Sequence, residues 1–164
     1  MARRVFFSFH YERDAWRAAQ VRNSWVTKRE GETVFFDAAD WEQVKSKGED
    51  ATRNWIDSQL EGTSVTVLLI GSETSEREYV VYEIKQSYRR GNGILGVYIH
   101  NLKDQQGRTD NKGKNPLDSL YIEKDGQRTD LSQIYHTYDW VNDDGYNRIA
   151  DWIEEAGQKA KASG

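Results

Sequence analysis

The chain has 164 residues and a net charge of −4 from 23 basic and 27 acidic side chains, which fits one domain around one core. The near-balance of charge gives no electrostatic basis for nucleic-acid binding, and the lack of cysteine excludes disulfides and thiolate zinc sites. No apolar run approaches 18 residues, and the apolar part of residues 1–9 is too short for a secretory signal, so we expect a soluble cytoplasmic protein without a membrane span. Six Trp, nine Tyr and five Phe predict an aromatic-rich core.

The first third of the chain alternates short apolar runs with helical periodicity. Residues 4–9 have the continuous apolar pattern of a buried strand, and residues 14–28 place apolar side chains at helical spacing. A second short strand is predicted over 33–36. A polar loop follows over 38–48, and residues 49–60 again have the pattern of a helix.

The middle of the chain contains the clearest strand. Residues 63–70 are uncharged, continuous and rich in β-branched side chains, which predicts a central strand buried on both faces. Residues 71–91 open with hydroxyls and continue as a helix, and residues 94–99 predict a fourth strand. A long polar loop then covers 102–130, with one short apolar island at 117–122.

The last part of the chain is less regular. Residues 134–141 are predicted as a fifth strand or a short irregular piece. A final helix is expected over 147–161, capped near Asp143 or Asp144.

Strands that alternate with helices predict one α/β domain over residues 1–156, followed by a flexible tail at 157–164. We expect a flavodoxin-like parallel sheet of order 2-1-3-4-5 with helices on both faces. In such sheets ligands bind beyond the carboxyl ends of the strands, where the winding reverses between strands one and three. A ligand site is therefore predicted at residues 8–11, the loop after Asp37, and residues 71–75.

Glu83 is the single acidic residue in the most apolar stretch of the third helix, and a helical wheel places it on the flank of the apolar stripe, next to Tyr79. The stripe predicted to face the sheet consists of Val80, Val81, Ile84 and Tyr88. A structural interpretation is a boundary glutamate that is solvated or forms a surface ion pair. Candidate partners for that pair are Lys85, Arg89 and Arg90. A functional interpretation is that a carboxylate in the first turns of a helix beginning at the strand-end crevice points toward a ligand.

Two further motifs lie at the ends of this helix. The hydroxyls of residues 72–75 either cap the helix or leave backbone N–H groups free to meet a phosphate, and the sequence leaves both interpretations open. Residues 91–96 match G-x-G-x-x-G, but they follow a helix and enter a strand, whereas a dinucleotide fingerprint follows a strand and opens a helix. Gly91 is therefore predicted to be a helix C-cap.

Three other chemistries are disfavoured. No two histidines stand at ligand spacing, so no metal site is predicted from His10, His100 and His136. Ser8, His10 and Asp37 lack the G-x-S-x-G elbow of a hydrolytic triad. A receiver-type phosphorylation site needs an aspartate at the end of the third strand, and residues 70–72 are Ile-Gly-Ser.

Three segments together resemble a TIR domain: RVFFSFHY at 4–11 its strand A box, VFFDAADWE at 34–42 its strand B and BB loop, and SVTVLLIGSETSEREYVVYEI at 64–84 its strand C and catalytic helix. TIR enzymes often carry an aromatic residue four positions before a catalytic glutamate. The matching pair here is Tyr79 and Glu83, with tyrosine in place of the usual tryptophan. More narrowly, the chain resembles the TIR-like ThsB family of bacterial Thoeris anti-phage defence. That likeness includes 94–104, 115–120 and 138–147.

The resemblance implies that the protein uses NAD⁺ as its substrate and needs no cofactor or metal. Members of this family cleave the bond between nicotinamide and ribose and join the freed ribose carbon to a hydroxyl elsewhere in the molecule. The resulting cyclic ADP-ribose isomer is a diffusible messenger that activates a separate NAD⁺-depleting effector of the ThsA type. TIR enzymes often need assembly, so the resemblance also implies a homo-oligomer.

On this interpretation Glu83 is the catalytic residue, and Tyr79 or Tyr82 stacks on nicotinamide or adenine. The predicted substrate-binding residues are Ser8, Phe9, His10, Tyr11, Asp37, Trp41, Ser72, Tyr79 and Tyr82. The competing hypothesis is a non-catalytic TIR-like interaction module that binds no NAD⁺. A pocket filled by the side chains of Tyr79 and His10 would favour that module.

Overall fold

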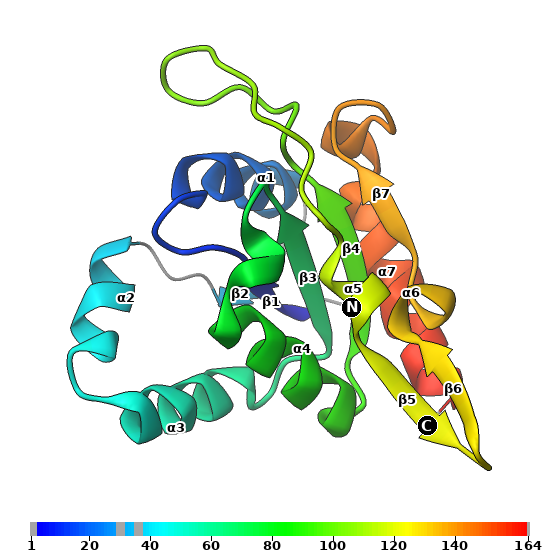
Figure 1. Cartoon of the computed structure of the whole chain (residues 1–164). Coiled ribbons are helices and arrows are strands. Elements are labelled where there is room, and N and C mark those ends of the chain that lie inside the picture. The colour runs from blue at the N-terminus through cyan, green and yellow to red at the C-terminus, as the bar shows by residue number, and fades with distance from the viewer. Residues whose placement is uncertain (1–2, 29–31, 35–37, 164) are drawn as a thin grey trace.

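The structure is a computed structural model that describes residues 3–28, 32–34 and 38–163. Its centre is a parallel five-stranded sheet with helices on both faces (Figure 1). Every neighbouring pair of strands is parallel. The strands lie in the order β2 (Glu32–Val34), β1 (Arg4–Ser8), β3 (Val65–Ile70), β4 (Gly93–Tyr98) and β7 (Thr137–Asp139). The predictions of a parallel sheet and of a central position for the 63–70 segment are confirmed.

Two strands stay outside this sheet. β5 (Tyr121–Lys124) and β6 (Gln127–Asp130) form an antiparallel hairpin of their own, so the edge strand of the main sheet is β7, which lies within the predicted fifth strand at 134–141. Asp125 and Gly126 make the turn with φ of 55° and 77°. Positive φ at both central residues is typical of the type I′ turn that closes two-residue hairpins. Part of the polar segment 102–130, predicted as a loop, is therefore a β-hairpin closed by a tight turn.

Alternation along β3 separates the two faces of the sheet. Val65, Val67 and Leu69 pack in one core cluster together with residues of α1 (Ala15–Lys28) and α7 (Gly145–Ser163). Leu68 and Ile70 pack in a second cluster that includes residues of α4 (Glu78–Arg90). α3 (Glu49–Leu60) lies beside α4. Each large side chain buried in these layers stabilises the fold by about 1.5–3 kcal/mol.

The core is rich in aromatic side chains, as predicted. The fully or almost fully buried aromatic residues include Phe6, Phe7, Phe9, Tyr11, Trp25 and Trp41. Among the helices in the described part of the chain, none combines the length and apolarity needed to cross a bilayer.

Several boundaries differ from the predictions. Residues 38–45, predicted as loop, form the helix α2 (Ala38–Lys45), and the second strand is described only as Glu32–Val34, because 35–37 lie outside the described residues. The fifth strand of the sheet is shorter than 134–141, since α6 (Leu131–Ile134) ends just before it. Short helical turns also occur at η1 (Thr74–Glu76) and α5 (Pro116–Ser119). α7 continues to Ser163, so residues 157–163, predicted as a tail, are helical.

The end of α4 agrees with the sequence. Gly91 has φ of 80°, and its backbone N–H donates to the carbonyl of Tyr88 at 3.0 Å. The N–H of Asn92 donates to the carbonyl of Ser87 at 3.0 Å. A residue in the left-handed conformation is the usual way to satisfy the last carbonyls of a helix. The predicted C-cap is confirmed, and the G-x-G-x-x-G match has no dinucleotide-binding context.

Candidate active site

Glu83 lies on the buried face of α4, directly against the sheet, with an exposed fraction of 0%. The buried positions of this helix are Val80, Glu83, Ile84 and Ser87, spaced three and four apart as one helical face requires. The predicted flank position is therefore wrong, and so is the place of Tyr88 in the stripe, because Tyr88 is 38% exposed. The face turned toward the sheet includes one carboxyl group where an apolar side chain was expected.

Two hydroxyl groups hold the carboxylate. Ser8 Oγ, at the end of β1, donates to Glu83 Oε1 at 2.7 Å. The hydroxyl of Tyr11, three residues further along, donates to Glu83 Oε2. Both bonds join segments more than 70 residues apart, so they exist only in the folded protein. Because the carboxylate is buried and held from the β1 side, the interpretation of Glu83 as a solvated or surface-paired residue is wrong.

Burial sets the protonation of this group. It raises the pKa of Glu83 to about 8, although the hydrogen bonds from Tyr11 and Ser8 favour the charged form and act in the opposite direction. Burial also raises the pKa of Tyr11 well above its ordinary value, and the nearby Glu83 charge adds to the shift. Tyr11 therefore remains a protonated donor throughout the physiological pH range.

Aromatic rings close the space around the carboxylate. The ring centroids of Tyr11 and Trp41 are 5.0 Å apart, and Trp41 meets Tyr79 edge to face at 4.9 Å. Phe9 packs edge to face on Tyr11 at 4.6 Å. Trp41 comes from α2, the helix in the segment predicted as a loop, and it is almost fully buried. The rings in contact here are those of Tyr11, Trp41 and Tyr79. A pocket filled by Tyr79 and His10 stays a prediction.

Glu12 fastens α2 to the rest of the site. Its Oε1 accepts from Trp41 Nε1 at 3.2 Å and from Lys45 Nζ at 3.2 Å, both on α2. The same oxygen accepts from Arg77 Nη2 at 3.1 Å, at the start of α4. The hydrogen bond from Lys45 is the main reason that the pKa of Glu12 is lowered. Sequence analysis missed Glu12, and only its position directly after Tyr11 pointed to it.

The other predicted site residues do not all lie beside Glu83. His10 is buried near the end of β1, where its Nδ1 accepts from the backbone N–H of Arg13 at 3.2 Å, and burial lowers its pKa. The Tyr82 hydroxyl turns away to Asp57 of α3, at 2.8 and 2.9 Å. Asp37 lies outside the described residues. Ser8 donates to Glu83 and not to His10, so the described contacts form no serine–histidine pair.

The hydroxyls of residues 72–75 do not cap α4. Its N-cap residue is Arg77, and no side chain caps that end. Ser72 Oγ instead donates to Asp110 Oδ2 at 3.2 Å, and Thr74 Oγ1 accepts from the backbone N–H of Gly71 at 2.7 Å. The capping interpretation is wrong, whereas phosphate contact at this turn stays a prediction.

Asp14 is a second buried carboxyl group, next to the site. It is 1% exposed, and its oxygens have no hydrogen-bond partner among the described residues. Burial raises its pKa to about 6, against the opposing charges of Arg13 and Arg17. A Cβ atom on Gly71 would overlap the Asp14 carboxylate, and a Cβ on Gly113 would overlap the backbone of Gly71. Three segments therefore meet here without room for a methyl group.

The groups that surround Glu83 are hydroxyls and aromatic rings. The described residues contain no group of three or more potential metal ligands. In its ionised form, a carboxyl group in a low-dielectric, aromatic-lined space is suited to stabilise a cation. Such a cation can be a bound substrate or a positively charged transition state.

Comparison with known proteins shows the family to which this site belongs. A family model described as "Thoeris protein ThsB, TIR-like domain" matches residues 6–104, which include Ser8, Tyr11, Trp41 and Glu83. The chain is also 37% identical over 191 residues to a protein of Bacillus cereus (strain MSX-D12) named "Putative cyclic ADP-D-ribose synthase ThsB1". That alignment covers 93% of this chain and 100% of the relative.

Proposed function

The chain belongs to the ThsB family of TIR-like proteins, and from this premise we propose that it cleaves the nicotinamide–ribose bond of NAD⁺ and closes the product into a cyclic ADP-ribose isomer. The observation that carries the proposal is Glu83, a fully buried carboxylate held by Ser8 and Tyr11 beyond the end of β1. The name of the Bacillus cereus relative supports the product class.

The chemistry fits a lone carboxylate. Nicotinamide leaves from a pyridinium as a neutral molecule, so the leaving group needs no general acid. The ribose carbon becomes cationic and oxocarbenium-like as the bond breaks, as in glycoside hydrolysis. Glu83 stabilises this charge electrostatically, and the two hydroxyl donors keep its oxygens fixed before the reaction begins.

The positive charge of the substrate favours the ionised form of Glu83. With a pKa of about 8, the free carboxyl group is mainly protonated at pH 7. The pyridinium of NAD⁺ is a nearby positive charge, and such a charge favours the ionised carboxylate. Binding of NAD⁺ thus drives Glu83 toward its active form.

The aromatic rings of the site favour the cyclisation step. An internal hydroxyl must attack the ribose carbon faster than water does, so water has to be excluded. Tyr11, Trp41 and Tyr79 close this space. Because Glu83 has no exposed surface, NAD⁺ reaches it only when α2 and Trp41 move aside. Trp41 or Tyr79 then stacks on the nicotinamide or adenine ring.

Other residues at the strand ends contact the rest of the substrate. His10 borders the substrate from the end of the first strand, and Ser72 lies at the turn after β3, where a phosphate can be met. Asp37, outside the described residues, stays a predicted substrate contact. The cyclic product is a messenger for a ThsA-type effector in anti-phage defence. The protein acts in the cytoplasm, needs NAD⁺ and no further cofactor, and works as a homo-oligomer.

A direct test compares cells that express the parent protein or its Glu83→Gln variant during phage infection. Chromatography with mass spectrometry of the small molecules should find a species with the mass of cyclic ADP-ribose only with the parent. Equal protein levels and equal melting temperatures are the control for folding. Linear ADP-ribose and nicotinamide alone would make the protein a plain hydrolase.

One observation favours a second function, that of a non-catalytic interaction module. Glu83 is completely covered in this conformation, as a purely structural carboxyl group would be. Under that hypothesis the parent and the Glu83→Gln variant leave NAD⁺ and its products unchanged, and neither makes the cyclic species.

A further inference from the structure

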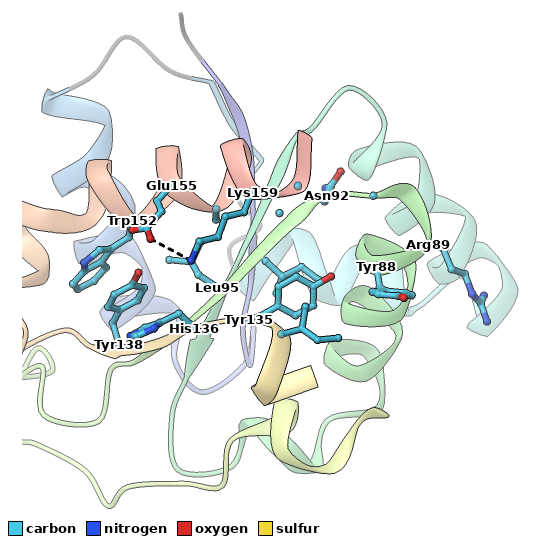
Figure 2. A pocket seen from close by; sticks show the side chains of 16 residues that line it. Tyr88, Arg89, Asn92, Leu95, Tyr135, His136, Tyr138, Trp152, Glu155 and Lys159 are labelled. Carbon is cyan, nitrogen blue, oxygen red and sulfur yellow. Dashed lines mark ion pairs between the residues drawn. The ribbon is translucent and has the colours of Figure 1, made fainter. Parts of the chain in front are cut away.

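A cavity of about 660 Å³ opens at the amino-terminal end of β4 (Figure 2). Its walls come from the end of α4, the first residues of β4, the segment from Ile134 to Tyr138, and the second half of α7. Both Ile94 and Leu95 line it. Consecutive residues of a strand face opposite sides of a sheet, so a cavity that touches both lies at the edge of the sheet, between two helices.

The strand register explains why this edge is open. β3 pairs with β4 from Gly93 onward, whereas β7 joins β4 only at Gly96, opposite Thr137. The first three residues of β4 therefore have a strand on one side only, within the part of the chain that the structure describes. We call the space beside them the edge slot, defined by the cavity along Gly93–Leu95.

Backbone polar groups face the edge slot. The N–H of Gly93 donates to Ser64 at 2.9 Å, toward β3, and the N–H of Gly96 donates to His136 at 3.0 Å, toward β7. Alternate residues of a strand direct their backbone groups to the same side, so Ile94 directs its N–H and C=O to the side of Gly96. The edge slot lies on that side, next to Ile94. The N–H and the C=O of Ile94 are thus placed to form hydrogen bonds with a strand added beside β4.

The walls of the edge slot are apolar and aromatic. Tyr138 is stacked on Trp152 with centroids 4.1 Å apart, and Tyr135 projects into the space (Figure 2). At the mouth, Tyr88 is 38% exposed and Ile134 is 43% exposed. Large apolar side chains left open beside a concave surface are typical of a binding site.

The rim is basic. Arg89 and Lys159 border the cavity from α4 and α7. Lys159 forms an ion pair with Glu155 at 3.2 Å, drawn in Figure 2, and both side chains are mostly exposed. An exposed pair of this kind contributes little to stability, about 0.3–0.5 kcal/mol, so Lys159 can exchange Glu155 for a carboxylate of a ligand.

We propose that the edge slot binds an extended peptide segment of a partner protein, which pairs with Ile94, buries one large apolar side chain between α4 and α7, and places an acidic residue near Lys159. The volume also suits a small molecule. The free edge of β4 favours a peptide, because a peptide backbone supplies both hydrogen bonds and its alternate side chain enters the cavity.

The edge slot is separate from the proposed NAD⁺ site. Glu83 is held at the carboxyl end of β1, whereas the edge slot lies at the amino end of β4. In a parallel sheet these are opposite ends. The partner peptide and NAD⁺ can therefore be bound at the same time, and the proposal does not depend on the proposed enzyme activity.

A displayed library of random heptapeptides, selected on the whole protein, tests the proposal. We expect enriched peptides to share a large apolar residue with an acidic residue nearby. Binding of a selected peptide should fall at least tenfold for Ala160→Trp, which fills the edge slot. It should fall at least threefold for Lys159→Glu and stay unchanged for Lys85→Glu, the same charge reversal on the exposed side of α4.

The backbone part of the proposal has its own readout. A selected peptide should slow hydrogen exchange of the Ile94 amide at least tenfold, and N-methylation of the peptide nitrogen next to the apolar residue should weaken binding at least tenfold. Melting curves show whether Ala160→Trp is folded, and the Lys159→Glu comparison stands if it is not. Failure to enrich peptides, unchanged exchange of Ile94, or tight binding of every N-methylated peptide would overturn the proposal; the last result would indicate a ligand held by side chains alone.

Discussion

Tyr11 donates its hydroxyl hydrogen to Glu83 from a position 72 residues earlier in the chain, and both side chains are buried in the interior of the fold. The bond joins the segment after β1 to α4 and favours the ionised form of Glu83. It therefore links the packing of two elements to the charge of one carboxyl group.

Replacement of Tyr11 by phenylalanine tests this link. Tyr11→Phe keeps the ring but removes a donor to the charged carboxylate, so the pKa of Glu83 should rise further and the rate of NAD⁺ turnover at pH 7 should fall about tenfold. Tyr82→Phe is a matched control, since it also removes a hydroxyl bond from α4 but one directed to Asp57. A pH–rate profile should shift upward for Tyr11→Phe only. Equal shifts in both variants would contradict the assignment.

The pH dependence of the parent follows from the same group. With Glu83 active as the carboxylate and its pKa at about 8, kcat/KM should rise almost tenfold per pH unit between pH 6 and 7.5 and level off above pH 8. The profile is measured as NAD⁺ turnover by the active protein in buffers of constant ionic strength. A flat profile from pH 6 to 9 would mean that Glu83 does not limit the rate through its protonation.

Stability should depend on pH in the opposite sense. The folded pKa of Glu83 is raised, so between its ordinary pKa of 4.5 and about 8 the unfolded chain has lost the proton that the folded protein keeps. The free energy of unfolding therefore falls as pH rises through this window and changes no further above it. Glu83→Gln cannot ionise, and its amide can donate to the hydroxyl oxygen of Ser8 or Tyr11. Its melting temperature relative to the parent should thus increase from pH 5 to pH 8.5. An equal difference at both pH values would argue against a buried, neutral Glu83.

Glu12 offers a test of the contact that fastens α2. Glu12→Ala removes the acceptor shared by Trp41, Lys45 and Arg77, and the loss of stability should be small, about 1–2 kcal/mol, because the two ion pairs are partly exposed. Hydrogen exchange of α2 should become clearly faster while that of β3 stays unchanged.

The control for this substitution is Glu42→Ala, an exposed acidic residue on α2 itself. It removes the same charge without touching the shared acceptor. If it loosens α2 as much as Glu12→Ala does, the effect belongs to the helix composition and not to the contact with Glu12.

The central strands could be predicted because their signal is local. Residues 65–70 are rich in β-branched side chains and buried on both faces, and they stand in the middle of the sheet, as their composition indicates. The hairpin at 121–130 carried an equally local signal, the Asp-Gly turn at 125–126, which the polar composition around it concealed. α2 was missed for a different reason, because Trp41 is the only residue in the described part of this helix, 40–45, that belongs to a core cluster.

Only part of the candidate site could be predicted from the sequence. Glu83 could be singled out as a carboxyl group in an apolar stretch, but its bonds to Ser8 and Tyr11 depend on which way β1 and α4 pack, and no local pattern encodes that. Tyr82 was assigned to the same site, although one position along the helix turns its hydroxyl to Asp57. Asp14 gave no signal, since a buried carboxyl group without partners resembles any polar residue before a helix.

The tight meeting of Asp14, Gly71 and Gly113 bears on how the length of this chain can vary. The alignment with the Bacillus cereus relative extends over 191 residues, more than the 164 of this chain, so that relative carries insertions. Gly113 has no space for even a Cβ atom, whereas Gly107, six residues earlier in the same loop, has open space around it. Natural length changes in this loop should therefore occur around residue 107 and leave residue 113 in place, because Gly113 packs directly against the backbone of Gly71 at the end of β3.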